Sequence, residues 1–345
     1  MVQVFDGHND ALTREDHAGI ASGRPNGHLD LPRMRAGGVR GGMFAVFSPS
    51  IGSEHWIPVP REDGIAEFEY AQPLDHAAAA AHASAAAGRL LALERAGDVR
   101  IARAIGDFDA AFAAGAGAPP LAVLHLEGAE AIDPDLEALD TWYAAGLRSL
   151  GPVWSRANDF GHGVPFIFPS SPDTGPGLTG AGKRLVRACA ERGILVDLSH
   201  LNEAGFWDVA RLEAGPLVAT HAAVHALSPT SRGLTNRQLD AIGGSGGLVG
   251  IIFGCAFLRA DMEDDDDTPV ALIAEHARYA ADRIGVEHVA LGSDFDGTTI
   301  PAGVGDVAGV TRVIDALRAA GFEGQELEAI AWRNWRRVLA AWWTG

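Results

Sequence analysis

Short apolar runs with a period of two recur along the chain, and glycine, proline or polar turn residues bound each run. This pattern is typical of β-strands that bury at least one face. It predicts eight strands, over Val2–Asp6, Gly41–Phe47, Leu121–Leu126, Arg148–Val153, Ile194–Ser199, Leu217–Thr220, Leu248–Phe253 and His288–Gly292.

Alanine-rich stretches of helical character lie between these runs. They predict helices over Ala71–Ala96, Leu136–Ala145, Ala181–Arg192, Glu203–Leu212, Val270–Ile284 and Val307–Ala320. Because strands that alternate with helices form parallel βαβ units, eight of them favour a closed (β/α)8 TIM barrel over an open sheet. The first strand is not followed by a Gly-x-Gly-x-x-Gly sequence, so a dinucleotide-binding fold loses its main support.

Length and composition fit a single barrel domain with loop insertions over residues 1–345. Cys189 and Cys255 are the only cysteines, too few for a disulfide framework, which favours a reducing compartment. The first ten residues do not resemble a signal peptide, and no window of about 18 apolar residues occurs. We therefore expect a cytoplasmic protein without a membrane anchor.

The charge excludes some partners. The sequence has 27 Lys and Arg against 45 Asp and Glu, a formal net charge of −18. Because a basic surface is missing, nucleic acid is not an expected partner. The acidic run at 263–267 is interpreted as a solvated loop. Trp332, Trp335, Trp342 and Trp343 have helical spacing and are expected to cover the barrel floor or a subunit contact.

Chemistry in such a barrel gathers where the strands end at their carboxyl side. Polar side chains of metal-ligand type follow five of the predicted strands: His8 and Asp10, Glu127, His200, His221 and Asp294. Residues i and i+2 of an extended segment face the same side, so His8 and Asp10 can chelate one ion. Imidazole and carboxylate suit Zn²⁺, although other divalent metals use them too. Two ions bridged by Glu127 would use His8, Asp10, Glu127, His200 and His221 together.

The remaining histidines are not assigned to the site. His125 shares a face with Glu127 but lies one layer deeper, which favours a core histidine or a group that supports a ligand. The others, His28 and His276 among them, fall on predicted loops or helices and are expected to have surface or packing roles.

Several of these motifs, taken in order, resemble the membrane (renal) dipeptidase family of zinc peptidases in the amidohydrolase superfamily. They are Asp6-Gly-His-Asn-Asp10, Leu126-Glu-Gly128, Asp197-Leu-Ser-His200, Thr220-His221 and Gly292-Ser-Asp-Phe-Asp-Gly297. The resemblance runs from about Val4 to the helix at Trp332–Leu339. It implies that His8 and Asp10 bind one Zn²⁺, that His200 and His221 bind a second, and that Glu127 bridges them. It also implies hydrolysis of dipeptides, including those with a C-terminal D-residue.

The residue types support this chemistry. Two ions about 3.5–4 Å apart supply a bridging hydroxide and polarise the scissile carbonyl. Amide cleavage also needs a proton shuttle for the leaving nitrogen. Asp294 is the candidate; Asp296 would lie on the same face of an extended segment, and the resemblance favours Asp294.

Substrate contacts are expected from two loops. A guanidinium can bind the dipeptide carboxylate through two parallel hydrogen bonds, and Arg232 stands where similar proteins carry such an arginine, although the register of this loop differs. After the fourth strand, Trp154 replaces a histidine that binds the substrate carbonyl oxygen in similar proteins. An indole cannot become cationic, so the metals, Trp154, or one of Arg156, Asn158 and His162 would stabilise the oxyanion.

The sequence thus predicts a zinc-dependent dipeptidase with catalytic Asp294 and substrate-binding Arg232, Trp154 and Asp294. One alternative is another amidohydrolase that acts on a small amide, lactam or ester. The other is a metal-binding homologue without turnover, which an intact Asp294 disfavours. A homodimer is left open.

Overall fold

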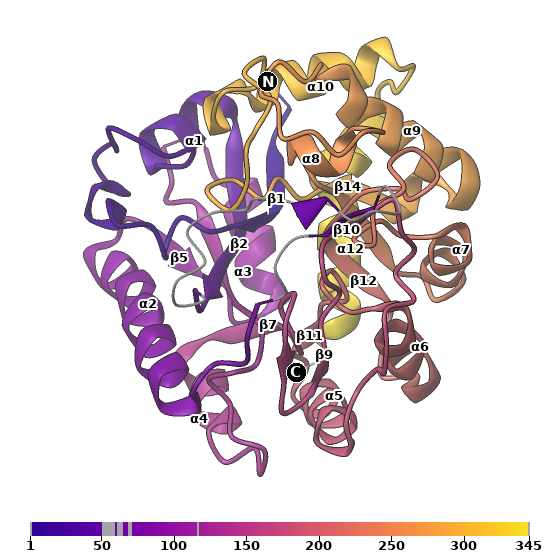
Figure 1. Ribbon diagram of the computed structural model, residues 1–345. Helices are drawn as coiled ribbons and strands as arrows, with labels where there is room; N and C mark the ends of the chain where they lie inside the picture. Colours follow the sequence, from indigo (N-terminus) through magenta and orange to yellow (C-terminus); the bar gives the residue numbers. More distant parts are fainter. Residues whose placement is uncertain (1, 50–58, 61–64, 68–70, 116, 344–345) are drawn as a thin grey trace.

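A ring of parallel strands forms the centre of the protein in the computed structural model, which describes residues 2–49, 59–60, 65–67, 71–115 and 117–343 (Figure 1). Parallel pairing links five strands in the order β1-β2-β6-β7-β11 and three in the order β12-β13-β14. Their bounds are β1 Val4–Asn9, β2 Val39–Phe47, β6 Leu121–Glu127, β7 Leu147–Gly151, β11 Leu195–Val196, β12 Val218–Ala222, β13 Leu248–Ile251 and β14 Val289–Leu291. The short β5, Arg100–Ile101, also pairs with β6.

Two parallel bridges close the ring. Asp197 pairs with Val218 between β11 and β12, and Asn9 pairs with Phe295 between β1 and the segment after β14. Each of the eight predicted strands overlaps one of the eight in this ring, so the predicted (β/α)8 TIM barrel is confirmed. β11 ends earlier than predicted because the Asp197 carboxylate accepts hydrogen bonds from the backbone of Ser199 and Thr220.

Helices surround the strands (Figure 1). Their bounds are α1 Leu31–Gly37, α2 His76–Ala96, α3 Ile105–Ala113, α4 Leu139–Ala145, α5 Gly180–Arg192, α6 Glu203–Leu212, α7 Asn236–Gly244, α8 Cys255–Leu258, α9 Ala271–Ile284, α10 Val310–Ala319, α11 Gln325–Glu328 and α12 Asn334–Trp342. The predicted helix at Ala71–Ala96 begins five residues late. Asp75 takes the capping position, and its side chain accepts a hydrogen bond from the Ala78 amide. The sequence did not predict α1, α3, α7, α8 or α11.

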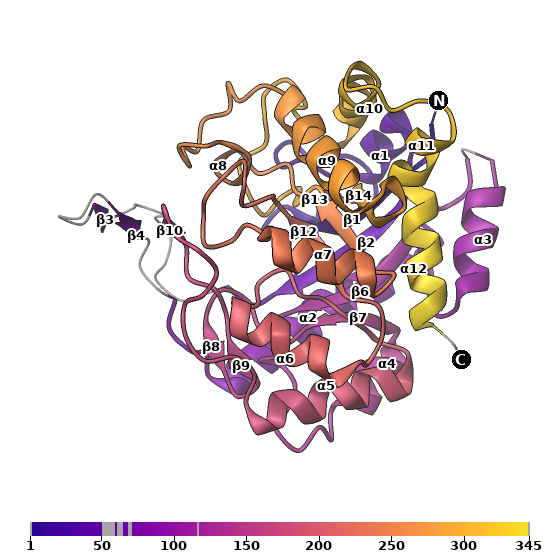
Figure 2. The ribbon, with the colours of Figure 1, turned by 90° about the vertical axis from the view of Figure 1, so that its right-hand side faces the viewer.

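Opposite ends of the barrel are built differently (Figure 2). At one end lies α12, where Trp335 is fully buried and donates a hydrogen bond from its indole to the Leu291 carbonyl, 2.9 Å away. A methyl group at Gly7 would overlap the Trp335 ring, so only glycine fits under this side chain. The expectation that Trp335 covers the floor is confirmed. A small sheet of β3 (Val59–Pro60), β4 (Ala66–Glu67) and β10 (Ile167–Phe168) projects at the other end.

Within the described ranges, the helices are all too short or too polar to cross a lipid bilayer.

Candidate active site

The five predicted metal ligands lie together at the carboxyl end of the barrel strands. His8 is in β1, Glu127 ends β6, and His221 is in β12, while Asp10 and His200 follow β1 and β11. All five side chains are buried. Glu127 is central, since its Oε1 lies 2.8 Å from His200 Nε2 and 3.5 Å from the Nε2 atoms of both His8 and His221.

Several atoms in this cluster have no protein partner. His8 Nδ1 and Nε2 and Asp10 Oδ1 are buried and have no hydrogen bond within the part of the chain that the structure describes. His8 Nε2 lies 3.5 Å from Asp10 Oδ2 and 4.0 Å from Asp294 Oδ1. Buried polar atoms without partners are costly, so a bound cation would stabilise this arrangement. The imidazole and carboxylate donors fit a divalent transition metal, and the groups His8–Glu127–His221 and His8–Asp10–Asp294 each have the spacing of an ion site.

Two histidines are oriented by neighbouring hydroxyl groups. The Ser155 hydroxyl lies 2.9 Å from His200 Nδ1. The Thr220 hydroxyl lies 2.9 Å from His221 Nδ1 and donates to Asp197 Oδ2 at 2.7 Å. A hydrogen bond at Nδ1 fixes the ring orientation and leaves Nε2 for an ion. Sequence reasoning gave Ser155 and Thr220 no role beside these rings, although Thr220 stands next to His221 in one of the quoted motifs.

Burial and charge act in opposite directions on the ionisable groups. Burial would raise the pKa of Glu127, but the charge of His8 and hydrogen bonds from His200 and His221 bring it well below its usual value. Burial would lower the pKa of His8, but Glu127 and Asp10 raise it well above the ordinary value. Burial and the charge of Arg232 lower the pKa of His200 to about 4, so this ring is neutral at neutral pH.

Asp294 and Asp296 point in different directions, although an extended segment would have placed them on one face. Both residues have a left-handed backbone, with φ of 62° and 72°. Asp294 lies near His8 and Asp10, whereas the Asp296 carboxylate accepts hydrogen bonds from Arg24 and from the His28 amide. Asp296 therefore stabilises the structure and is not available to a substrate. Burial, followed by the charges of Asp10 and Glu127, raises the pKa of Asp294 well above its usual value.

Arg232 lies beside the predicted ligands. Its Nη2 is 3.1 Å from His200 Nε2 and donates to the His221 carbonyl at 3.1 Å. Nε and Nη1 are buried and have no hydrogen-bond partner in the described portion of the chain. Burial lowers the pKa of Arg232 to about 10, which still leaves the guanidinium charged at neutral pH. The group can therefore bind an anion next to the metal ligands.

Trp154 also adjoins this cluster. Its ring centroid lies 5.8 Å from that of His200 and 4.9 Å from that of Phe47, and the residue is 8% exposed. The three alternative oxyanion donors have partners elsewhere. The Arg156 side chain binds Glu130 and the Ser48 carbonyl, that of Asn158 binds the Pro152 carbonyl, and His162 faces the Gly177 carbonyl.

His125 lies beneath the cluster, as the sequence predicted. It is fully buried, its Nδ1 is 2.8 Å from the Ser149 hydroxyl, and its ring packs edge-on against His8 with centroids 5.3 Å apart. Burial lowers its pKa to about 4. His125 is thus a neutral packing partner of a candidate ligand.

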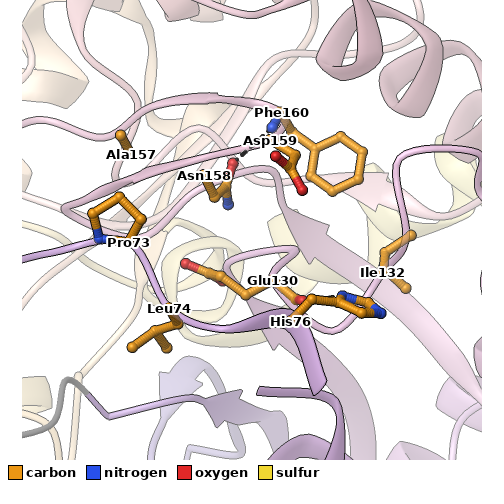
Figure 3. A pocket seen from close by; sticks show the side chains of 9 residues that line it. All are labelled: Pro73, Leu74, His76, Glu130, Ile132, Ala157, Asn158, Asp159 and Phe160. Carbon is orange, nitrogen blue, oxygen red and sulfur yellow. Dashed lines mark hydrogen bonds between the residues drawn. The ribbon is translucent and has the colours of Figure 1, made fainter. Parts of the chain in front are cut away.

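A separate cavity of about 220 Å³ opens between the start of α2 and the loops after β6 and β7 (Figure 3). Some of its polar lining is already engaged. His76 Nδ1 lies 2.8 Å from the Glu130 carbonyl, and Asn158 accepts a hydrogen bond from the Phe160 amide. The cavity contains none of the predicted ligands and does not belong to the candidate site.

Comparison with known proteins shows which proteins the chain is similar to. The family model of the membrane dipeptidases (peptidase family M19) matches residues 1–342. A metallo peptidase from Rhodobacter sphaeroides, solved with a phosphinate mimic of the dipeptide L-Ala-D-Ala, is 44% identical, with a TM-score of 0.93 over 99% of each chain. The structure of the M19 metallo peptidase dipeptidase AC is 44% identical, with a TM-score of 0.92 over 100% of this chain and 99% of that one. A protein of Klebsiella pneumoniae encoded in the pqqA 5′ region is 52% identical over 221 residues, 64% of this chain and 82% of that protein.

Proposed function

The chain belongs to the membrane dipeptidase family and is a metal-dependent dipeptidase, and from this premise we propose that it hydrolyses small dipeptides, including those with a C-terminal D-residue. The observation that carries this proposal is the arrangement of Glu127 among three imidazole Nε2 atoms, with the unpartnered guanidinium nitrogens of Arg232 beside them. Binding and hydrolysis of a dipeptide require metal ligands and a carboxylate-binding group at the same barrel mouth.

Five residues would hold two Zn²⁺ ions. We assign His8 and Asp10 to one ion, His200 and His221 to the other, and Glu127 to both. When bound, such a pair of ions lowers the pKa of a shared water and polarises the scissile carbonyl. The donor types are those that zinc prefers, and the unpartnered atoms of His8 and Asp10 support an ion on that side.

Asp294 is the proton-transferring group in this proposal. Its carboxylate lies 4.0 Å from His8 Nε2, and its raised pKa favours a group that can hold a proton. Peptide hydrolysis needs this step because an amine anion is a very poor leaving group. Asp294 would take a proton from the attacking water and return it to the departing nitrogen.

Arg232 would bind the substrate carboxylate through Nε and Nη1, the two nitrogens that have no partner among the described residues. This contact restricts the substrate to peptides whose carboxylate is one residue from the cleaved bond. The ligand of the Rhodobacter sphaeroides protein, which mimics L-Ala-D-Ala, supports tolerance of a D-residue at that position. Trp154 would contact the substrate on the His200 side.

The proposal is tested by incubating the zinc-loaded protein with L-Ala-D-Ala, L-Ala-L-Ala, an N-acyl amino acid and a small lactam. We expect cleavage of the dipeptides. Cleavage of only the N-acyl amino acid or the lactam would contradict the proposal and favour the other amidohydrolase chemistry.

Arg232→Met sharpens this test. We expect KM for L-Ala-D-Ala to rise about 10- to 100-fold, since a charge-assisted pair is lost. The C-terminal amide of the same dipeptide lacks the carboxylate, so wild type and variant should hydrolyse it equally slowly. Arg237→Met is the matched control, because the Arg237 side chain is 79% exposed. An equal loss on both substrates would argue against carboxylate binding.

A homodimer and a cytoplasmic location stay predictions.

A further inference from the structure

The turn that carries Asp294 has an uncommon backbone conformation. Asp294 and Asp296 both have positive φ, a region that few non-glycine residues occupy, although Asp adopts it more readily than most, and the contacts around this turn help to maintain it. Backbone hydrogen bonds attach this turn to the end of β1. The Asp294 amide donates to the His8 carbonyl at 3.0 Å, and the Asp10 amide donates to the Phe295 carbonyl at 2.8 Å. Within the turn, the Gly297 amide donates to the Asp294 carbonyl at 3.1 Å, and the side chain of Asp296 is held by other groups.

Arg24 holds the outer part of this turn. Its Nη1 donates to Asp296 Oδ2 at 2.6 Å, and both side chains are completely buried. The same guanidinium donates to the Leu29 carbonyl at 2.8 Å and binds Asp16 through Nε and Nη2. Arg24 therefore connects the turn after β14 to the loop between β1 and α1.

His28 completes the hold on Asp296. Its backbone amide donates to Asp296 Oδ1 at 2.6 Å, and its Nδ1 accepts a hydrogen bond from the Asp296 amide at 2.9 Å. Both carboxylate oxygens of Asp296 and its amide are thus engaged. Gly27 makes the approach possible, because its φ is +76° and a Cβ there would overlap the Arg24 guanidinium.

We propose that Arg24 is a positioning residue for the reaction. By binding Asp296, it keeps the Asp294–Asp296 turn in the left-handed conformation that directs the Asp294 carboxylate toward His8 and Asp10. Arg24 does not touch the substrate, and it acts through Asp296 and the backbone. This inference rests on the proposed function insofar as Asp294 is the proton-transferring group.

The test separates positioning from a general contribution to folding. Arg24→Met leaves the Asp296 carboxylate buried without its cation, so we expect a lower Tm and a kcat reduced about 100-fold, with KM almost unchanged. The double variant Arg24→Met/Asp296→Asn removes the unpaired charge, and its amide oxygen can still accept from His28. Its Tm should therefore return most of the way to wild type while kcat stays low. Arg14→Met, an exposed change in the same loop, is the control.

A double variant with wild-type kcat would overturn the proposal, because the ion pair would then serve stability alone. If the wild-type protein cleaves no dipeptide, the proposed function fails, and the crystal structure of the double variant still decides the positioning role. We expect Asp294 to leave the left-handed region and its carboxylate to move away from His8. An unmoved Asp294 would refute the role of Arg24.

Discussion

The two sides of Glu127 are organised by different means. On one side, His200 and His221 have hydroxyl partners at Nδ1, and their Nε2 atoms lie 3.0 Å apart. On the other side, neither nitrogen of His8 nor Oδ1 of Asp10 makes a hydrogen bond in the described ranges. The first side is fixed by hydrogen bonds that exist without an ion. The second depends on packing, on the turn at Asp294, and on whatever cation binds there.

This difference predicts that the two proposed ions bind with different affinities. Ligands that are already oriented lose less conformational freedom when an ion binds. The proposed ion at His200 and His221 should therefore be held more tightly. The ion at His8 and Asp10 should respond more strongly to changes in the turn after β14.

Glu127→Gln tests both sides at once and should have the largest effect. Because an amide binds cations far more weakly than a carboxylate, we expect hydrolysis to fall about 1000-fold or more. The variant should keep about one zinc per chain, at His200 and His221. Anomalous scattering at the zinc edge measures the occupancy of each position. Two ions at equal and full occupancy would contradict both the bridging role and the inequality.

Gly297→Ala should disturb only the His8 side. A methyl group at Gly297 would overlap Asp294 Oδ1 and Asp10 Oδ2. Displacement of these carboxylates by a few tenths of an ångström or more should reduce kcat/KM about 100-fold and lower the zinc occupancy at His8. Gly244→Ala, where a Cβ meets no atom within 4 Å, is the control. Loss of the ion at His221 instead would show that the His200–His221 side, and not the His8 side, depends on this turn.

Ser155→Ala should disturb the opposite side. The substitution removes the hydroxyl at His200 Nδ1, and such partners affect metal affinity about 10- to 100-fold. Competition with a chelator gives the affinity, and Ser84→Ala, an exposed change on α2, is the matched control. If the affinities of both ions fall by the same factor, the two sides are not independent.

The barrel and the candidate ligands could be predicted because both depend on local patterns. Each strand shows its own apolar run, and parallel strands in a barrel all end at the same mouth. His8, Glu127 and His221 therefore come together without any knowledge of long-range contacts. Each of these residues follows or ends a run that can be recognised alone.

Arg24 and the direction of Asp296 could not be predicted in this way. Arg24 lies in an irregular loop, and its partner is 272 residues away in sequence. The period of two that placed Asp294 and Asp296 on one face fails where the backbone turns left-handed. Ser155 meets His200 across 45 residues, through the irregular segment after β7, whose path the strand pattern does not specify.

The smallest effect is expected at His276, which contacts the loop that follows His221. Its Nδ1 accepts a hydrogen bond from the Val224 amide at 2.9 Å, so its Nε2 donates to the Leu258 carbonyl at 3.0 Å. Burial lowers the pKa of His276 from 6.5 to about 4. Above pH 6.5 the ring is neutral in both the folded and the unfolded chain. As the pH falls, the unfolded chain binds the proton first, so the free energy of unfolding decreases by up to about 1.4 kcal/mol per pH unit until about pH 4.

His276→Gln isolates this contribution, because glutamine can accept and donate but does not titrate in this range. In urea unfolding of the metal-free proteins, the free energy of unfolding of wild type should fall by about 1.6 kcal/mol more than that of the variant between pH 6.5 and 5. Identical pH dependence would mean that His276 is protonated without cost in the folded state. The expected result would show that acid destabilises the protein at the contact between His276 and the loop after His221. The turn at Gly297 has no contact with His276 among the hydrogen bonds of the described residues, so its conformation should not change with this titration.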